Sequence, residues 1–573
     1  MSAETEEDGL RRAAVSPHRA SGSVGSRPQR SMPVLAAVAC AFSLAQFLLV
    51  VPGLGLGWDE TVYVSQVSGH SPAAFFSAPR ARGITFLAAP VAAVTASTTA
   101  LRVWLAVLSG CGLLLGLRVW RRLLPTPVVA GAGLLFAGLW VTVLYGPQAM
   151  PNLWVAFGAF AAVGCFLRAV RGSGDRRALL GLGGAVAFVA LMRPMDAVWL
   201  TLALTGAAFV TSGRRPPHLL VVVLISGTAL GGAEWVIEAV LRYGGLPERL
   251  RRASEIQGHL GWHFAVDDHL RALSGITLCR PCTVPWRHQP AGLWFLALPF
   301  LVVAGIRAAR NNGYRAPIAM AAWAGAAMAA PYLFTVGYAA PRFLLPAYLL
   351  LAVPVAQLLV SALSTGRSDA RRRRVTAALI ATALAAHVAI QYLVLHAVVE
   401  RVRADTSSLR HISAVLRAQG VHPPCVVSGD EAIRVAYHIG CSSRLLSGHD
   451  ASITPGALAA TAERMPVVVL VSGSGQPPGF AGSWRAQSFP GLGDRTPLRA
   501  YLSLTTQPRP TRPKAKVEQA AGTSTARNGA NQLPCPCGFA VFTWPSSRLS
   551  SPHRRDGAPR TDLRHARRRR ALP

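Results

Sequence analysis

Apolar segments of about 17 to 25 residues recur between residues 33 and 397 of this chain. That is the length an α-helix needs to cross the roughly 30 Å hydrocarbon core of a membrane. The composition agrees, since 51% of the residues are hydrophobic, only 14% are charged and the mean hydropathy is +0.35. A soluble protein of 573 residues would be more polar. The pattern therefore predicts a polytopic membrane protein and excludes a soluble multidomain enzyme.

Arginine clusters between the apolar segments predict the orientation. With the N-terminus in the cytoplasm, every inner loop is basic, as the positive-inside rule requires. Residues 83–98 contain Pro90, and a span there would turn the following clusters outward, so we expect a re-entrant or interfacial helix. The first apolar segment is expected to be a retained span, not a cleaved signal peptide. About 11 spans result, at 33–52, 101–117, 127–145, 151–168, 178–193, 196–212, 218–241, 291–307, 316–336, 343–363 and 375–397.

The regions outside the spans differ in composition. The N-terminal segment is polar and is expected to be disordered in the cytoplasm. After the last span, apolar strands alternate with helix-like stretches, which predicts a small extracytoplasmic α/β domain. An Arg- and Pro-rich tail without periodicity follows and is expected to be disordered. We therefore predict an all-α, multi-pass protein of the cell membrane with an added α/β domain. The divisions are 1–32, 33–399 (with outer loops at 53–100 and 242–290), 400–505 and 506–573.

The formal net charge of +33 does not indicate nucleic-acid binding. Nearly all basic residues are arginines in short clusters between apolar segments or in the tail, and no basic stripe is interleaved with aromatic residues. We expect membrane lipid around the chain and no nucleic-acid partner. The sequence also lacks a P-loop, a dinucleotide-binding fingerprint and a nucleophile elbow, so it does not support ATP- or NAD-driven chemistry.

An acidic pair, Asp59-Glu60, follows the first apolar segment. Only 25 of the 573 residues are acidic, and carboxylates are costly near a bilayer, so a pair at a membrane face indicates a functional site. The alternative is that the pair merely ends the first span. Trp58 and Tyr63 beside it suit an interfacial anchor at a defined depth. A carboxylate there would act as a general base on a hydroxyl group or would bind a divalent cation.

Other charged residues gather at the predicted outer face. Arg342, at the mouth of a late span, would either bind phosphate oxygens in a bidentate way or snorkel at an ordinary helix end. Arg193, in a charged break between two spans, would close a turn by ion pairing or contact a substrate. Glu234 and Glu238 share one helix face and would either line a cavity or pair with Arg242.

Two histidines in the second outer loop, His259 and His263, have a spacing that allows them to share a metal ion. The polarity of the loop explains them equally well, and contact of His263 with a substrate is the favoured functional interpretation. We therefore predict no metal site from these residues.

Two pairs of cysteines are expected outside the membrane, where thiol pairs oxidise. Cys425 and Cys441 bracket a strand–helix unit whose ends would lie close together, and we predict a disulfide between them. Cys279 and Cys282 are also expected to form a disulfide, the alternative being half of a metal knuckle.

Together these features resemble the C-type membrane glycosyltransferases (the GT-C superfamily), integral membrane enzymes that use a polyprenyl-phosphate sugar donor. The resemblance covers about residues 33–400. Some members have a Lys-Pro-Pro segment that is missing here, and Pro-Arg-Ala-Arg-Gly at 79–83 occupies a similar place. The matched features are Asp59-Glu60 with Tyr63 in a long first outer loop, the turn from Tyr145 to Asn152, the break at Arg193-Pro194, the stretch from Tyr338 to Pro346, and the outer soluble domain.

The resemblance implies transfer of a mannose or arabinose-like sugar from the carrier to a hydroxyl group of a glycan, glycolipid or protein acceptor. Asp59 would deprotonate the acceptor, with inversion at the anomeric carbon, and Arg342 would stabilise the leaving phosphate. Glu60 would position the acceptor or help to bind a divalent cation. The other substrate-binding residues that the resemblance implies are Tyr63, Arg80, Arg82, Arg193, Tyr338 and His263.

Two other functions remain as alternatives. A polytopic transporter or lipid flippase would need charges in the middle of several spans and an internal repeat. Here the charges gather at the predicted outer face and we find no repeat, which favours the enzyme. The third interpretation is a structural membrane protein whose outer domain binds a partner.

Overall fold

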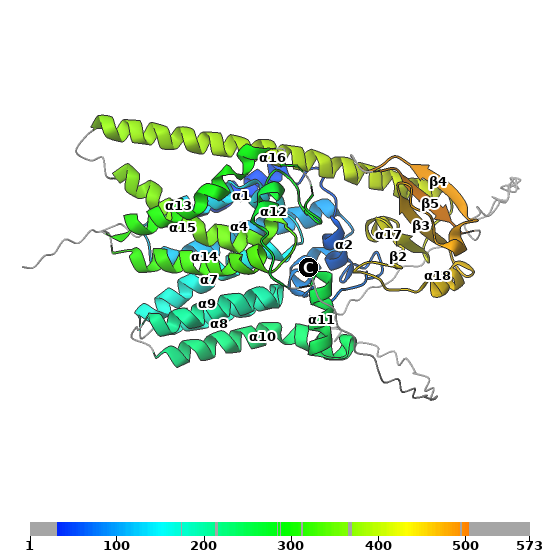
Figure 1. The fold of residues 1–573 in the computed structure, drawn as a ribbon, viewed down its shortest axis with the longest axis horizontal. Helices are drawn as coiled ribbons and strands as arrows, with labels where there is room; N and C mark the ends of the chain where they lie inside the picture. The colour runs from blue at the N-terminus through cyan, green and yellow to red at the C-terminus, as the bar shows by residue number, and fades with distance from the viewer. Residues whose placement is uncertain are drawn as a thin grey trace, which may run out of the picture. The chain divides into compact units, whose positions relative to one another are not determined.

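The structure, a computed structural model, is mostly helical, with one five-stranded sheet (Figure 1). The predicted N-terminal segment up to residue 30 and the Arg- and Pro-rich tail lie outside the described residues. The residues described are 31–172, 175–211, 216–259, 261–283, 285–286, 288–310, 313–364, 370–492 and 496–503.

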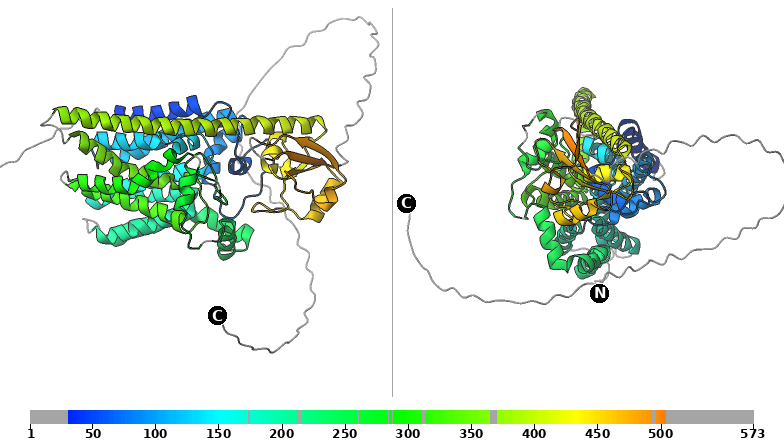
Figure 2. Two further views of the ribbon diagram at one scale, coloured as in Figure 1. Left: turned by 45° about the horizontal axis from the view of Figure 1, so that its top comes forward. Right: turned by 90° about the vertical axis from the view of Figure 1, so that its right-hand side faces the viewer.

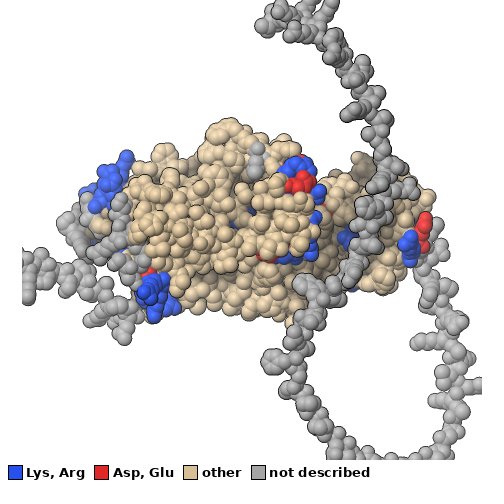
Figure 3. Space-filling model, turned by 90° about the horizontal axis from the view of Figure 1, so that it is seen from below, with Lys and Arg blue, Asp and Glu red and all other residues tan. Residues whose placement is uncertain are grey.

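Long helices form a bundle in which they run side by side (Figures 1 and 2). Eight of the described helices are long and apolar enough to cross a membrane, and we describe the chain as a multi-pass membrane protein. The space-filling view agrees, because most of the bundle's length is uncharged and basic side chains gather at the end away from the sheet (Figure 3). The eight are α1 (Ser31–Leu49), α4 (Thr98–Trp120), α7 (Pro151–Arg171), α10 (Pro217–Tyr243), α13 (Leu293–Ala308, extended by the 3-10 turn Gln289–Gly292), α14 (Arg315–Phe334), α15 (Leu345–Ser364, extended by the 3-10 turn Pro341–Leu344) and α16 (Ala370–Ala418).

Shorter helices complete the bundle. The predicted span 127–145 is interrupted at Gly138, a residue of low helix propensity, and gives two helices. The predicted spans 178–193 and 196–212 correspond to two consecutive helices that meet at Arg193. These shorter helices are α5 (Thr126–Ala137), α6 (Trp140–Tyr145), α8 (Arg176–Met192) and α9 (Pro194–Val210).

Small residues let the helices approach closely. Where α10 packs on α8, a Cβ added to Gly231 would stand 1.9 Å from the carbonyl oxygen of Ala187. A Cβ added to Gly305 on α13 would stand 2.0 Å from the carbonyl oxygen of Pro354 on α15. Helices in a membrane associate through close packing of this kind, because lipid tails are as apolar as the side chains they contact.

The two long loops contain short helices near the end of the bundle that faces the sheet. The first loop holds α2 (Trp58–Ser65) and α3 (Gly83–Ala92). At 1.5 Å per residue α3 is about 15 Å long, too short to cross a membrane, as expected for the segment that contains Pro90. The second loop holds α11 (Leu246–Ile256) and α12 (Val266–Ala272).

A small α/β domain follows the last long helix. Strand β1 (Val426–Gly429) is parallel to β2 (Ser442–Ser443) and β3 (Val467–Ser472), and β5 (Leu498–Leu502) is antiparallel to β3 and to β4 (Arg485–Phe489). The strand order is β2-β1-β3-β5-β4, with helices α17 (Ala432–Ile439) and α18 (Pro455–Ala462) in the connections. The structure joins Cys425 to Cys441, the pair expected from the sequence.

Helix α16 links the two parts of the fold. It continues without a break past residue 400, where the sequence suggested the start of the α/β domain, and ends at Ala418. Figures 1 and 2 show it running along the bundle and on to the sheet. The residues from 400 to Ala418 therefore belong to the last long helix of the bundle.

Candidate active site

The acidic pair lies at the start of α2, which packs against α17 of the α/β domain. Successive residues of a helix point about 100° apart, so the two carboxylates face different surroundings. The Glu60 side chain is buried and only 3% exposed, whereas the Asp59 side chain is 36% exposed. The two carboxylates are therefore suited to different tasks.

Glu60 fixes the first loop to the bundle. Both of its carboxylate oxygens accept hydrogen bonds from the guanidinium of Arg102 on α4, which is fully buried. Glu60 Oε1 also accepts from the Ala149 backbone N–H at 2.7 Å, and Oε2 accepts from the Gly57 N–H at 3.0 Å. Arg102 donates in addition to the Pro147 carbonyl oxygen at 2.9 Å. These bonds tie α2, α4 and the turn from Tyr145 to Asn152 together.

Asp59 lies between two arginines from distant parts of the chain. Its Oδ1 accepts from Arg80 Nη2 at 2.9 Å, and its Oδ2 accepts from Arg342 Nη2 at 3.1 Å. Burial alone would raise the pKa of Asp59, but the Arg80 and Arg342 guanidiniums outweigh it and hold the pKa below its ordinary value. The carboxylate is therefore ionised at neutral pH.

Two cavities meet at Asp59 and Arg342, which line both. The first, of about 310 Å³, lies among α2, α6, α16 and the start of α17, and it includes the carboxylates of Asp405 and Glu431. The second, of about 260 Å³, lies between the first and second loops. Its basic lining comes from Arg80, Arg193, Arg280 and Arg342.

Five of the residues expected to contact a substrate line the second cavity, and these are Tyr63, Arg80, Arg193, Tyr338 and Arg342. Burial is the main cause that raises the pKa of Tyr63 to about 12, so its hydroxyl is neutral and can donate a hydrogen bond. Arg193 also forms the ion pair with Asp196 that was its alternative interpretation, at 3.3 Å. Both interpretations of Arg193 thus fit its position.

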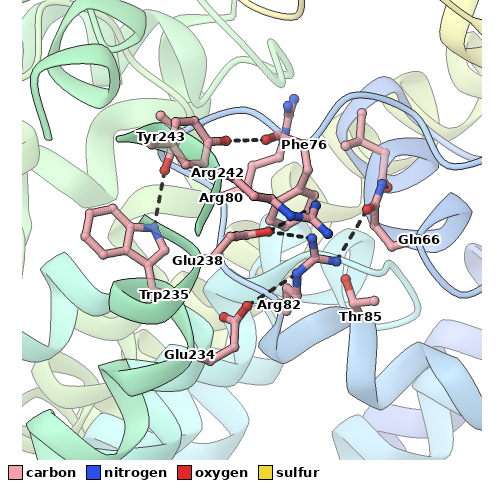
Figure 4. Close-up of polar contacts among 12 residues, drawn as sticks. Gln66, Phe76, Arg80, Arg82, Thr85, Glu234, Trp235, Glu238, Arg242 and Tyr243 are labelled. Carbon is pink, nitrogen blue, oxygen red and sulfur yellow. Dashed lines mark hydrogen bonds and ion pairs between the residues drawn. The ribbon is translucent and has the colours of Figure 1, made fainter. Parts of the chain in front are cut away.

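Arg82 lies outside both cavities and binds α10 (Figure 4). Its Nη2 is 2.6 Å from Glu238 Oε1, and its Nε is 3.3 Å from Glu234 Oε1. Glu238 pairs with Arg242 as well, at 3.4 Å, and with Arg249 on α11 at 3.0 Å. Glu234 and Glu238 therefore anchor the first loop to α10.

The same cluster holds the backbone that positions Arg80. Arg249 donates to the carbonyl oxygens of Ala78 and Arg80, each at 3.0 Å. Trp235 Nε1 donates to Ala78 O at 3.2 Å. The Tyr243 hydroxyl donates to Phe76 O at 2.5 Å, a contact that Figure 4 also shows. With its backbone held in this way, Arg80 can extend its side chain toward Asp59.

The second loop contributes to the site through a disulfide. Cys279 and Cys282 are bonded to each other, and the Cys279 backbone pairs with Ala339, next to the segment that contains Arg342. Arg342 Nη1 donates to the Thr277 carbonyl oxygen at 3.2 Å.

His263 lies apart from both cavities, where its backbone N–H donates to Phe334 O. Within the described ranges, no group of three or more His, Cys, Asp or Glu side chains is placed to hold a metal ion.

Two residues at the site, Arg102 and Asp450, had no recognisable signal in the sequence. Arg102 lies within an apolar span and resembles an ordinary interfacial arginine. Asp450, in a loop of the α/β domain, is 2.6 Å from Arg80 Nη1, and its Oδ2 accepts from Trp58 Nε1 at 3.0 Å. Contacts between residues so far apart in the chain leave no local pattern, so only the fold reveals them.

No protein-family model and no curated protein sequence matches this chain. Its fold is similar to that of ArnT from Cupriavidus metallidurans, in crystal structures of the undecaprenyl phosphate complex and of the apo state. Each has a TM-score of 0.56 at 12% sequence identity and covers 83% of this chain and 99% of that chain. The oligosaccharyltransferase of Archaeoglobus fulgidus in the apo form also matches, with a TM-score of 0.48, 14% identity, and coverage of 78% of this chain and 70% of that one. The likeness to ArnT confirms the fold that the sequence indicated, an all-α multi-pass membrane bundle with a small added α/β domain.

Proposed function

We propose that this protein is a membrane glycosyltransferase that moves a sugar from a polyprenyl-phosphate carrier to an acceptor hydroxyl group. The observation that supports this most directly is the position of Asp59, an ionised carboxylate between two arginines where two cavities meet. The fold supports it too, because the ArnT structure of the same fold is bound to undecaprenyl phosphate.

The second cavity suits the phosphate of the donor. Four arginine side chains line it, and a guanidinium binds phosphate oxygens in a bidentate way. Of these arginines, Arg342 pairs with Asp59 Oδ2, and Arg80 pairs with the other carboxylate oxygen, Oδ1. Its Nε has no hydrogen-bond partner within the described residues. When the sugar leaves, the phosphodiester of the donor becomes a phosphomonoester and gains negative charge, which the arginines stabilise in the transition state.

The first cavity then receives the acceptor. Asp59 takes the proton of the acceptor hydroxyl, and the oxygen attacks the anomeric carbon from the face opposite the phosphate. The bond between that carbon and the phosphate oxygen breaks, and the configuration inverts. Binding of the donor phosphate to Arg342 draws that cation away from Asp59, which makes the carboxylate a stronger base once the donor is in place.

The site faces the outer side of the membrane in this proposal. Helix α4 begins near the first loop and ends close to Arg118, Arg121 and Arg122 at the opposite end of the bundle. Because clusters of this kind mark the cytoplasmic side, the first loop and the α/β domain lie outside. We propose mannose or an arabinose-like pentose as the sugar, and a glycan, glycolipid or protein as the acceptor.

The experiment is transfer of label from radiolabelled polyprenyl-phosphate mannose and polyprenyl-phosphate arabinose in membranes that contain the protein. Asp59→Asn should lower turnover by about 10² to 10⁴, the usual contribution of a general base, while binding of the donor changes little. Asp267→Asn is the matched control, because that carboxylate is 57% exposed on α12 and lies outside both cavities. Near-normal transfer by Asp59→Asn would reject the assignment of the base, and no transfer by the unaltered protein with either donor would reject the donor class.

A further inference from the structure

We propose that Asp450 of the α/β domain is a positioning residue for Asp59, acting through Arg80, which the two carboxylates share. This inference rests on the proposed function, in which Asp59 is the base. It makes the α/β domain a part of the catalytic machinery, beyond any role in binding a partner.

The geometry places one guanidinium between two carboxylates. Arg80 Nη1 is 2.6 Å from Asp450 Oδ1, and Arg80 Nη2 is 2.9 Å from Asp59 Oδ1. Arg80 and Asp450 are nearly buried, with side-chain exposures of 11% and 7%. Water therefore screens this ion pair less than it would screen a pair on the surface.

Asp450 reaches the site from a closed loop. The backbones of Leu445 and Ser452 are hydrogen bonded at 2.8 Å, and the Ser452 hydroxyl accepts from the Leu445 N–H. Within the described part of the chain, the Asp450 carboxylate bonds only Arg80 and Trp58, both on the first loop. The hydrogen bonds of the Asp450 carboxylate therefore connect the α/β domain to the first loop.

Sharing Arg80 weakens its hold on Asp59. Arg80 donates Nη1 to Asp450 Oδ1 at 2.6 Å and shares Nη2 between Asp59 Oδ1 at 2.9 Å and Asp450 Oδ2 at 3.5 Å. It therefore neutralises Asp59 less than a bidentate pair with Asp59 alone would. The negative charge of Asp450 also opposes the surrounding cations, since it is the one carboxylate other than Asp59 among the described residues that line the second cavity. Without Asp450, Arg80 would be free to pair with Asp59 through both nitrogens, and Asp59 would be a weaker base. The charged and titratable groups around Asp59 in this balance come from both cavities. Arg80, Arg193, Arg280, Arg342, Tyr63, Tyr338, His449 and Asp450 line the second cavity, and Glu60, Tyr145, Asp405, Glu431 and Arg434 line the first.

The test compares Asp450→Asn with the unaltered full-length protein in nanodiscs, with polyprenyl-phosphate sugar as the donor. We expect turnover to fall about tenfold, the effect of one charged hydrogen bond, while the KM for the donor changes less than about threefold. The acid limb of the pH–rate profile should move to lower pH, because Asp59 becomes more tightly paired. Asp450→Glu keeps the charge and should recover most of the turnover with the acid limb in its original place. Glu463→Gln, at the end of α18, is the control in the same domain.

A second comparison separates positioning from simple attachment of the domain. In an Arg80→Gln background, Asp450→Asn should cause no further loss of turnover, because the proposed route through Arg80 is already removed. An equal loss in both backgrounds, or a loss with an unmoved acid limb, would overturn the inference. So would equal losses for Asp450→Asn and Asp450→Glu. If the unaltered protein transfers sugar and Asp450→Asn behaves identically, only the positioning role fails; if the unaltered protein transfers none, the proposed function fails and the positioning role fails with it.

Discussion

Replacing Arg102 by methionine should destabilise the folded protein by about 3 to 5 kcal/mol, the usual cost of removing one partner of a buried ion pair. The change removes the guanidinium that pairs with both oxygens of Glu60 and leaves a carboxylate whose side chain is only 3% exposed. The N–H groups of Gly57 and Ala149 remain as donors to it, but neither bears a charge. The folding equilibrium should therefore fall by between about a hundredfold and a few thousandfold.

The reciprocal change removes the negative charge of the Glu60–Arg102 ion pair. Glu60→Gln keeps the shape of the side chain but leaves the Arg102 cation buried beside the Pro147 carbonyl oxygen. The double variant Glu60→Gln/Arg102→Met has no buried charge at this position. Its loss in free energy of unfolding should therefore be smaller than the sum of the two single losses by about 2 kcal/mol or more.

The measurement is unfolding by SDS titration in mixed micelles, followed by tryptophan fluorescence, for the two single variants and the double variant. Arg118→Met is the matched control, because Arg118 is an exposed residue at the other end of the same helix. Its replacement should change the free energy of unfolding by no more than about 0.5 kcal/mol. Losses for the two single changes that simply add, or an Arg102→Met variant as stable as the control, would refute the reasoning.

Two further outcomes follow from the site and the second loop. Arg342→Ala should raise the KM for the donor and also lower turnover, because the phosphate is present in both the ground state and the transition state, and Arg342→Lys should restore only part of each. Steady-state kinetics with a polyprenyl-phosphate sugar would measure both, and an unchanged KM would contradict the placement of the phosphate. Burial lowers the pKa of His269 to about 4 from its ordinary 6.5, so the unfolded chain binds its proton first and stability should fall by about 3 kcal/mol as the pH drops from about 6.5 to 4. His269→Gln should flatten that dependence in SDS titrations across this range, and an unchanged slope would show that His269 is not its source.

Much of the fold follows from the lengths of the apolar segments. The bounds of helices such as α7 and α10 lie within a few residues of the predicted spans. A long apolar segment in a membrane forms a helix because its backbone groups must be hydrogen bonded within the segment. The strands β1 and β3 follow from runs of valine between turn residues. The extension of α16 beyond residue 397 was not predictable in the same way, because its second half is not uniformly apolar and is stabilised by packing against the α/β domain.

The candidate site was predictable only in part. Asp59 and Arg342 stand out as charged residues at span ends, and the structure places them 3.1 Å apart although 283 positions separate them. The sequence does not distinguish the roles of Asp59 and Glu60, because they are adjacent residues of the same chemical type. Only the helix geometry shows that Glu60 is buried and Asp59 is partly exposed. The roles of Arg102 and Asp450 are not predictable from the sequence, because their partners lie far away in the chain and no local pattern encodes such a pairing.

The unbroken course of α16 connects the α/β domain directly to the bundle of long apolar helices. A helix is stiff over this length, and the stretch from Val394 to Ala418 spans roughly 36 Å, so a change of 5° in its tilt would move the far end by about 3 Å. That displacement is comparable with the length of the contact between Arg80 and Asp450. Helices tilt in response to the thickness of the membrane around them. We therefore expect lipid composition to change the contact between the α/β domain and the first loop, and we expect the proposed transfer reaction to run at different rates in membranes of different thickness.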